Sequence, residues 1–373
     1  MDKGISNLEV RRQNRRSILN LLYKNGGMTV LELVKALELS QPTVFNIVKE
    51  LAAEGLVQQT DSLESSGGRK PRINRVVVSA RYSLGIAVTK NHLRITAVNL
   101  GAEVIHQEKH DLLFNDSEEY YAALKGICEN VILRCGYPRE KLLGIGISLP
   151  GIIQSGGEEM TFAPTLGIGT LKLCRFRALF GEPVTIANNA KLAALTELWG
   201  EGRGDGAIYL LVGGGVGGAI LTGENTFDLN SRSGEFGHMT VVDGGEVCSC
   251  GRRGCFEVYV SSGVLARNSS GGLSGFFKEL REGDGEKRKI WRDYLRVFAL
   301  GIDNLHTIFD NEIIIGGEMS EYIKEYEAEL RRELEGRRPL TAGTDFLRVG
   351  SFGEYDASVG AALMHVSKYL MDS

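Results

Sequence analysis

The segment Cys248–Glu257, CSCGRRGCFE, places three of the chain's six cysteines within eight residues. Gly251 and Gly254 permit the tight turns that bring three thiolates to one point. A tetrahedral zinc site needs a fourth ligand, and His238 in the segment SGEFGHM is the nearest candidate. A disulfide is disfavoured in a reducing compartment, and an iron–sulfur cluster usually takes four cysteines. The pattern therefore predicts a structural Zn²⁺ held by His238, Cys248, Cys250 and Cys255.

The N-terminal segment MDKGISNLEVRRQNRRSILN lacks the apolar core of a secretory signal. We also find no run of about 18 apolar residues that would cross a membrane. We therefore expect a cytoplasmic protein without a membrane partner. The length of 373 residues predicts two or three domains, at about 100–200 residues each.

The first 81 residues carry 13 Lys/Arg and 8 Asp/Glu, a net charge of +5, whereas the whole chain carries −4 and the remainder therefore −9. A basic segment on an acidic body indicates that only this segment meets a polyanion. Its pattern predicts three helices and a hairpin: Thr29 and Glu32 form a capping box, Ser40 caps the third helix, and Val44 and Leu51 belong to the buried face of that helix. Residues 1–80 are predicted to form a winged helix-turn-helix DNA-binding domain.

The exposed side of the third helix presents polar residues suited to DNA. Asparagine and glutamine pair bidentately with adenine in the major groove, and lysine contacts phosphate more readily. The segment SSGGRKPR that follows indicates a wing whose arginines suit a narrow minor groove, with a basic interdomain linker as the alternative. For each helix residue, a solvated position without a DNA role is also open. The predicted DNA contacts are Gln41, Thr43, Asn46, Lys49, Arg69 and Lys70.

From about residue 82, short β-rich runs such as YSLGIAVT and LLGIGISLPG alternate with helical stretches. This alternation is typical of an α/β fold. A second block begins near AIYLLVGGGVGGAILTG, and the chain ends in a helix, YDASVGAALMHVSKYL.

The EFGH segment, the motif CxCGxxGC and the acid after it closely resemble the signature of the ROK family (repressor, open reading frame, kinase). SLPGII, IANN, LVGGGVGGAI and IIIGGEMS fall where this family has its recurring elements. The resemblance covers essentially the whole chain. It implies an actin-like, ribonuclease-H-like body of two α/β lobes with a sugar in the cleft between them. The lobes are expected at residues 81–187, completed by the C-terminal helix at about 355–373, and at residues 188–354.

The resemblance also implies a set of sugar contacts, because carboxylates and amides pair with vicinal hydroxyls. His238 would both ligate zinc and contact the sugar in the cleft. For Glu235, the alternative interpretation is a surface carboxylate without a binding role. The residues that match the family's hydroxyl-binding positions, or lie directly beside them, are Asn188, Asn189, Glu235, His238 and Glu257.

The chain departs from the family's kinases at two places. Asn189 stands where the kinases have the general-base Asp, and an amide cannot accept the proton; such a loss typically costs about 10²–10⁴-fold in rate. Ala87 and Thr89 replace the Asp and Gly of the kinase phosphate loop, so ATP and Mg²⁺ are not expected. A remnant of the phosphate site persists at Gly213, Gly214, Gly215 and Gly217, whose amides could cradle an anion; a tight hairpin retained for folding explains these glycines equally well.

Together these features predict a sugar-responsive transcriptional regulator that acts as a repressor and has no catalytic residues. It would bind operator DNA as a homodimer or a dimer of dimers. Two alternatives remain open: an ATP-dependent hexose or N-acetylhexosamine kinase that keeps a DNA-binding head, and a DNA-binding protein whose sugar cleft no longer works.

Overall fold

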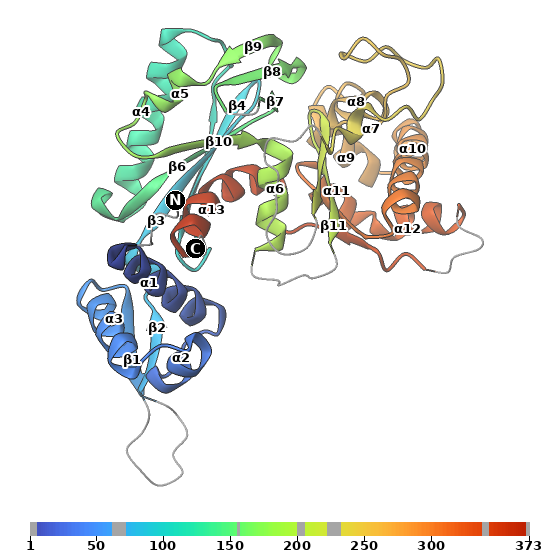
Figure 1. Ribbon diagram of the computed structural model, residues 1–373. Helices are drawn as coiled ribbons and strands as arrows, with labels where there is room; N and C mark the ends of the chain where they lie inside the picture. The colour runs from blue at the N-terminus through green and yellow to red at the C-terminus, as the bar shows by residue number, and fades with distance from the viewer. Residues whose placement is uncertain are drawn as a thin grey trace, which may run out of the picture.

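The computed structural model describes residues 6–61, 72–154, 157–199, 206–221, 233–337 and 343–370. Figure 1 shows a small head beside two larger lobes. No helix within these ranges is both long and apolar enough to cross a membrane.

The head consists of three helices and an antiparallel hairpin: α1 (Asn7–Lys24), α2 (Val30–Leu37), α3 (Gln41–Ala53), β1 (Val57–Asp61) and β2 (Arg72–Val76). The predicted caps are present, since Ser40 Oγ accepts from the amide of Thr43, and Thr29 forms the capping box with Glu32. The buried face of α3 includes Val44 and Leu51, as expected. The predicted winged helix-turn-helix is confirmed, with β1 and β2 as its wing.

The first lobe is built on a five-stranded sheet of order β10-β6-β3-β4-β5. Strands β10, β6 and β3 are parallel, and β3, β4 and β5 are antiparallel. A three-stranded sheet adjoins it. The elements are β3 (Tyr82–Val88), β4 (His92–Asn99), β5 (Val104–Asp111), α4 (Glu118–Arg134), β6 (Leu142–Leu149), β7 (Ile152–Ile153), β8 (Glu159–Ala163), β9 (Ile168–Lys172), α5 (Cys174–Arg177) and β10 (Val184–Asn188).

The second lobe is built on a four-stranded sheet of order β12-β11-β13-β14, in which β11 and β12 form the antiparallel hairpin around the glycine turn. Helices with an aromatic core around Trp291 and Phe277 pack against it. The elements are β11 (Ala207–Val212), β12 (Val216–Leu221), α7 (Glu257–Val260), α8 (Ser262–Ala266), α9 (Gly272–Arg281), α10 (Gly285–Phe309), β13 (Glu312–Gly316), α11 (Met319–Glu325), α12 (Glu327–Glu335) and β14 (Leu347–Val349).

Two helices join the lobes. α6 (Asn189–Leu198) lies between the two large sheets, and α13 (Asp356–Leu370) packs against both α6 and the five-stranded sheet (Figure 1). Their backbones approach so closely that a Cβ on Gly360 would lie 1.7 Å from Leu192 O, so this crossing requires glycine. The predicted α/β, actin-like architecture is confirmed.

Candidate functional site

A cavity of about 510 Å³ lies between the lobes and is lined by residues from both sheets and from α6. This volume is in the range of small-molecule sites. The structure brings together in its wall all five predicted sugar contacts and the glycine turn: Asn188, Asn189, Glu235, His238, Glu257, Gly213, Gly214, Gly215 and Gly217.

The first turn of α6 forms one wall. Asn188 caps the helix: its Oδ1 accepts from the amides of Ala190 (3.0 Å) and Lys191 (3.3 Å), and its Nδ2 donates to Gly151 O (3.0 Å). Much of the Asn188 amide is therefore engaged with backbone, which leaves Asn189 as the more available amide at this wall. Lys191 is 5% exposed and also lines the cavity, and it was not foreseen from the sequence.

Two carboxylates face this wall from the second lobe. Glu235 is exposed to the cleft, yet burial by the surrounding protein raises its pKa, and the charge of Glu257 adds to this rise. The charges of His238 and Lys191 act in the opposite direction. Glu257 accepts from the amide of Val216 (2.9 Å), which ties it to the hairpin. The site thus combines hydrogen-bond acceptors with a cationic donor, a set of groups that can pair with hydroxyls.

The Cys3His group predicted from the sequence is assembled beside the cleft. One ligand atom from each of its four residues lies within 4.8 Å of the others. Cys248 Sγ is 3.6 Å from His238 Nδ1, and Cys250 Sγ is 3.7 Å from Cys255 Sγ. Tetrahedral Zn²⁺ with Zn–S bonds of about 2.3 Å would place its ligands about 3.8 Å apart, so the donor set and its spacing fit that ion.

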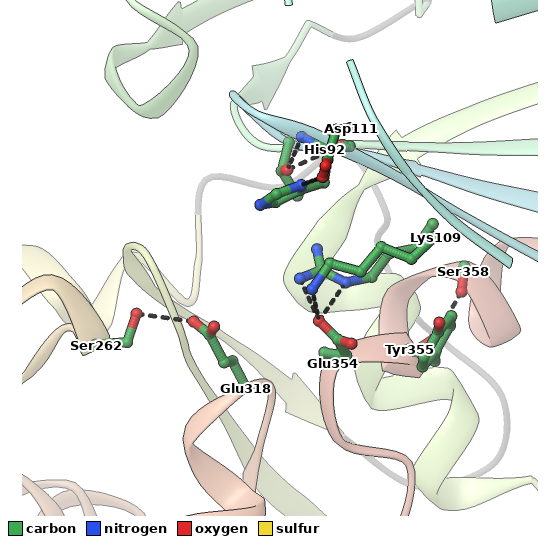
Figure 2. Close-up of polar contacts among 10 residues, drawn as sticks. His92, Lys109, Asp111, Ser262, Glu318, Glu354, Tyr355 and Ser358 are labelled. Carbon is green, nitrogen blue, oxygen red and sulfur yellow. Dashed lines mark hydrogen bonds and ion pairs between the residues drawn. The ribbon is translucent and has the colours of Figure 1, made fainter. Parts of the chain in front are cut away.

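The glycine turn is flanked by carboxylates. Besides Glu257, Glu318 approaches it: a Cβ on Gly213 would lie 3.8 Å from Glu318 Cβ and 4.0 Å from its Oε2. Ser262 Oγ donates to Glu318 Oε2 (2.8 Å), which fixes the carboxylate, as Figure 2 shows. Two negative groups beside these amides oppose the binding of phosphate.

The other side of this half of the cleft carries an ion-pair cluster. Arg94 Nε donates to Glu354 Oε2 (2.9 Å). Lys109 Nζ donates to the same oxygen (2.8 Å), as Figure 2 shows. Burial opposes ionisation of Glu354, but these two cations lower its pKa below the usual value. Ala87 ends in a methyl group, and Thr89 Oγ1 donates to His92 O in the β3–β4 turn. At the position of Ala87 this side therefore lacks the carboxylate that the family's kinases have there. The ion pairs of Arg94 and Lys109 with Glu354 stabilise it instead.

Four of the six predicted DNA contacts lie on α3, and they differ in exposure. Gln41, Asn46 and Lys49 are exposed. Thr43 is half-buried, and its hydroxyl is 2.8 Å from Ser40 Oγ within the helix cap. The predicted wing residues Arg69 and Lys70 lie outside the described residues.

Sequence reasoning missed Lys191, Glu318 and the Arg94–Glu354 pair. Lys191 lies two residues after Asn189, and Glu318 directly follows the glycine pair of IIIGGEMS, so proximity to quoted motifs was an available signal. The Arg94–Glu354 pair joins residues 260 positions apart, and nothing local marks it.

A model of the ROK family matches residues 83–367, and a model of winged helix-turn-helix DNA-binding domains matches residues 11–58. The putative xylose repressor of Caldicellulosiruptor sp. (strain Rt8B.4) is 28% identical over 89% of this chain and 90% of its own. A ROK family transcriptional regulator, a homologue of the E. coli MLC protein, has a TM-score of 0.75 at 21% identity and covers 97% of this chain and 98% of its own. A ROK family glucokinase from Streptomyces griseus, crystallised with glucose and AMPPNP, has a TM-score of 0.60 at 22% identity and covers 76% of this chain and 98% of its own.

Proposed function

Because the chain belongs to the ROK family and carries a winged helix-turn-helix head, we propose that it is a sugar-responsive transcriptional repressor. The head would bind operator DNA in the cytoplasm, and the cleft would bind a monosaccharide. The observation that carries the proposal is the coexistence in one chain of a DNA-binding head and a cleft that gathers Asn189, Glu235 and Glu257. The relative's name makes D-xylose the first sugar to test.

In this proposal Asn189, Glu235, Glu257 and the edge of His238 that faces the cleft bind sugar hydroxyls. Lys191 supports the negative charge of Glu235, and Asn188 mainly holds the α6 wall in place. Zn²⁺ would be held by His238, Cys248, Cys250 and Cys255. When bound, this ion would cross-link the EFGH segment to the CxCGxxGC motif, so its role is structural.

An ATP-dependent sugar kinase is the second candidate, because the same architecture occurs in a glucokinase. The residues at the nucleotide half of the cleft count against it. Asn189 cannot act as a general base, Ala87 offers no carboxylate for Mg²⁺, and Glu318 brings a negative charge to the glycine turn. A coupled assay with ATP, Mg²⁺ and D-xylose, D-glucose or N-acetyl-D-glucosamine tests this: turnover above about 1 s⁻¹, at the lower end of typical enzymes, would establish a kinase.

The proposed function is tested with a duplex that the wild-type protein selects from a random-sequence library. Operator affinity is measured with and without each of the three sugars, and calorimetry measures the binding of each sugar. We expect one sugar to bind and to change operator affinity by about 5–150-fold. Failure of all three sugars to bind would leave a DNA-binding protein without a working sugar cleft.

We further propose that the protein binds its operator as a dimer, because two heads match a palindromic site. Light scattering of the free protein and of its complex with the selected duplex gives the stoichiometry. Two chains per duplex support this proposal, and one chain per duplex contradicts it.

A further inference from the structure

α6 runs from the cleft to the DNA-binding head. Its first turn lines the cleft, and Trp199, which follows the helix directly, packs against the apolar core shared by the head and α13. Ten helical residues span about 15 Å, so one rigid element reaches both places.

At the cleft, the first turn of α6 cannot move independently of the ligand-binding residues. The Asn188 side chain connects the amides of Ala190 and Lys191 to Gly151 of the first lobe. Lys191 acts electrostatically on Glu235 of the second lobe. A ligand that closes the lobes around Asn189 and Glu235 therefore acts directly on this end of the helix.

Along its length, α6 is enclosed by protein. α13 contacts it at Gly360, where there is no room for a methyl group, and Thr196 Oγ1 donates to Asp356 O (2.7 Å). On the other side, a Cβ on Gly217 of β12 would lie 3.3 Å from Ala190 Cβ. Close-packed interiors transmit displacement instead of absorbing it, so α6 should move as a body.

At the head, Trp199 meets α1. Trp199 Nε1 donates to the hydroxyl of Tyr23 (2.7 Å), and the two rings meet edge to face with centroids 6.3 Å apart. Tyr23 lies in the last turn of α1, whose residues Ile18 and Leu22 belong to the same core as α3. A shift of Trp199 is thereby passed to the helix that presents Asn46 and Lys49.

We propose that α6 transmits occupancy of the cleft to the head, and that the Trp199–Tyr23 hydrogen bond is the joint through which it acts. This inference rests on the proposed function, because it requires a sugar that changes operator affinity. Trp199 and Tyr23 are positioning residues: they contact neither sugar nor DNA, and they set the coupling between the two sites.

The test uses Tyr23→Phe and Trp199→Phe, which remove the acceptor and the donor of this bond and keep an aromatic ring. Tyr369→Phe is the matched control, because Tyr369 of α13 interacts with Arg15 of the same head but does not belong to α6. For each full-length protein, affinity for the selected duplex is measured with and without D-xylose, D-glucose and N-acetyl-D-glucosamine. Calorimetry gives sugar affinity without DNA, and thermal unfolding verifies folding.

We expect the sugar that acts on the wild type to change operator affinity by about 5–150-fold in the wild type and in Tyr369→Phe. In Tyr23→Phe and Trp199→Phe this change should fall below about threefold, while sugar affinity in the absence of DNA stays near that of the wild type. Linkage makes the effect reciprocal, so the duplex should also lose its influence on sugar affinity.

Trp199 also reports on the joint directly, because the chain has two tryptophans and the other, Trp291, is buried in the second lobe. The sugar should change tryptophan emission in the wild type and much less in Trp199→Phe.

The outcomes separate this inference from the proposed function. A wild-type response that persists in full in both joint variants overturns the relay and leaves the proposed function intact. Loss of the response in Tyr369→Phe, with retention in Tyr23→Phe, places transmission in α13 and also overturns the relay. A wild type whose operator affinity no sugar changes refutes the proposed function, and the relay with it.

Discussion

Replacement of Gly360 by alanine tests how tightly α13 is held between its neighbours. The new Cβ would lie 1.7 Å from Leu192 O, whereas real Cβ contacts below 3.0 Å essentially never occur, so α13 would have to move by more than 1 Å. Movement away from α6 is blocked by the sheet, whose backbone already packs closely against α13. A Cβ added to Gly85 or Gly146 of the sheet would lie within 2 Å of an α13 carbonyl oxygen. Alanine favours a helix by about 1 kcal/mol, and overpacking against rigid backbone costs about 1–3 kcal/mol or more. Because the clash is with rigid backbone on both sides, the cost should lie at the upper end of this range, which leaves a net loss of about 2 kcal/mol.

The measurement is urea unfolding followed by circular dichroism, with Gly126→Ala as the matched control. Gly126 lies within α4, and a Cβ there would meet nothing within 4 Å. The same substitution should therefore stabilise the protein by about 0.5–1 kcal/mol at this position. The two variants should differ in sign. A Gly360→Ala protein at least as stable as the wild type would refute the close-packed crossing of α6 and α13.

Three further predictions concern the metal group, a buried acid and the head. Purified protein should contain about one zinc ion per chain by mass spectrometry, and Cys255→Ser should lose both the ion and thermal stability; full stability of a metal-free protein would contradict this. Burial raises the pKa of Asp356 to about 7. The folded state therefore keeps a proton that the unfolded chain releases near pH 4, so stability should fall by up to about 4 kcal/mol from pH 4 to 7 and level off above. In urea titrations, Asp356→Asn should lose less stability than the wild type as the pH rises. If the unfolding free energies of both proteins fall in parallel with pH, this prediction is wrong. Lys49→Ala should weaken binding to all duplexes alike, and it should reduce by about 1 the slope of log K against log salt concentration. Asn46→Ala should cost about 1–3 kcal/mol of binding free energy on the selected duplex alone. Equal losses on all sequences in both variants would show that Asn46 does not recognise a base.

Local signals in the sequence were sufficient to predict the helices of the head. Side-chain caps act within three or four residues, so Ser40 and Thr29 marked their helices before any tertiary contact was known. The Cys3His group could also be predicted from the sequence, because three of its ligands lie within eight residues and His238 lies only ten residues before them. The resemblance added the two-lobed body and the residues of the cleft.

Only the tertiary structure decided which groups disfavour nucleotide binding and which contacts connect the cleft to the head. The role of Glu318 depends on its proximity to Gly213, more than one hundred residues earlier, and that of Glu354 on its ion pair with Arg94 of β4. The Trp199–Tyr23 bond spans 176 residues. The helix caps and the Cys3His group depend on residues that are near one another along the chain, so the sequence by itself determined them. Charge pairing in the cleft and contact between head and body depend on distances that exist only once the sheets and α13 have packed.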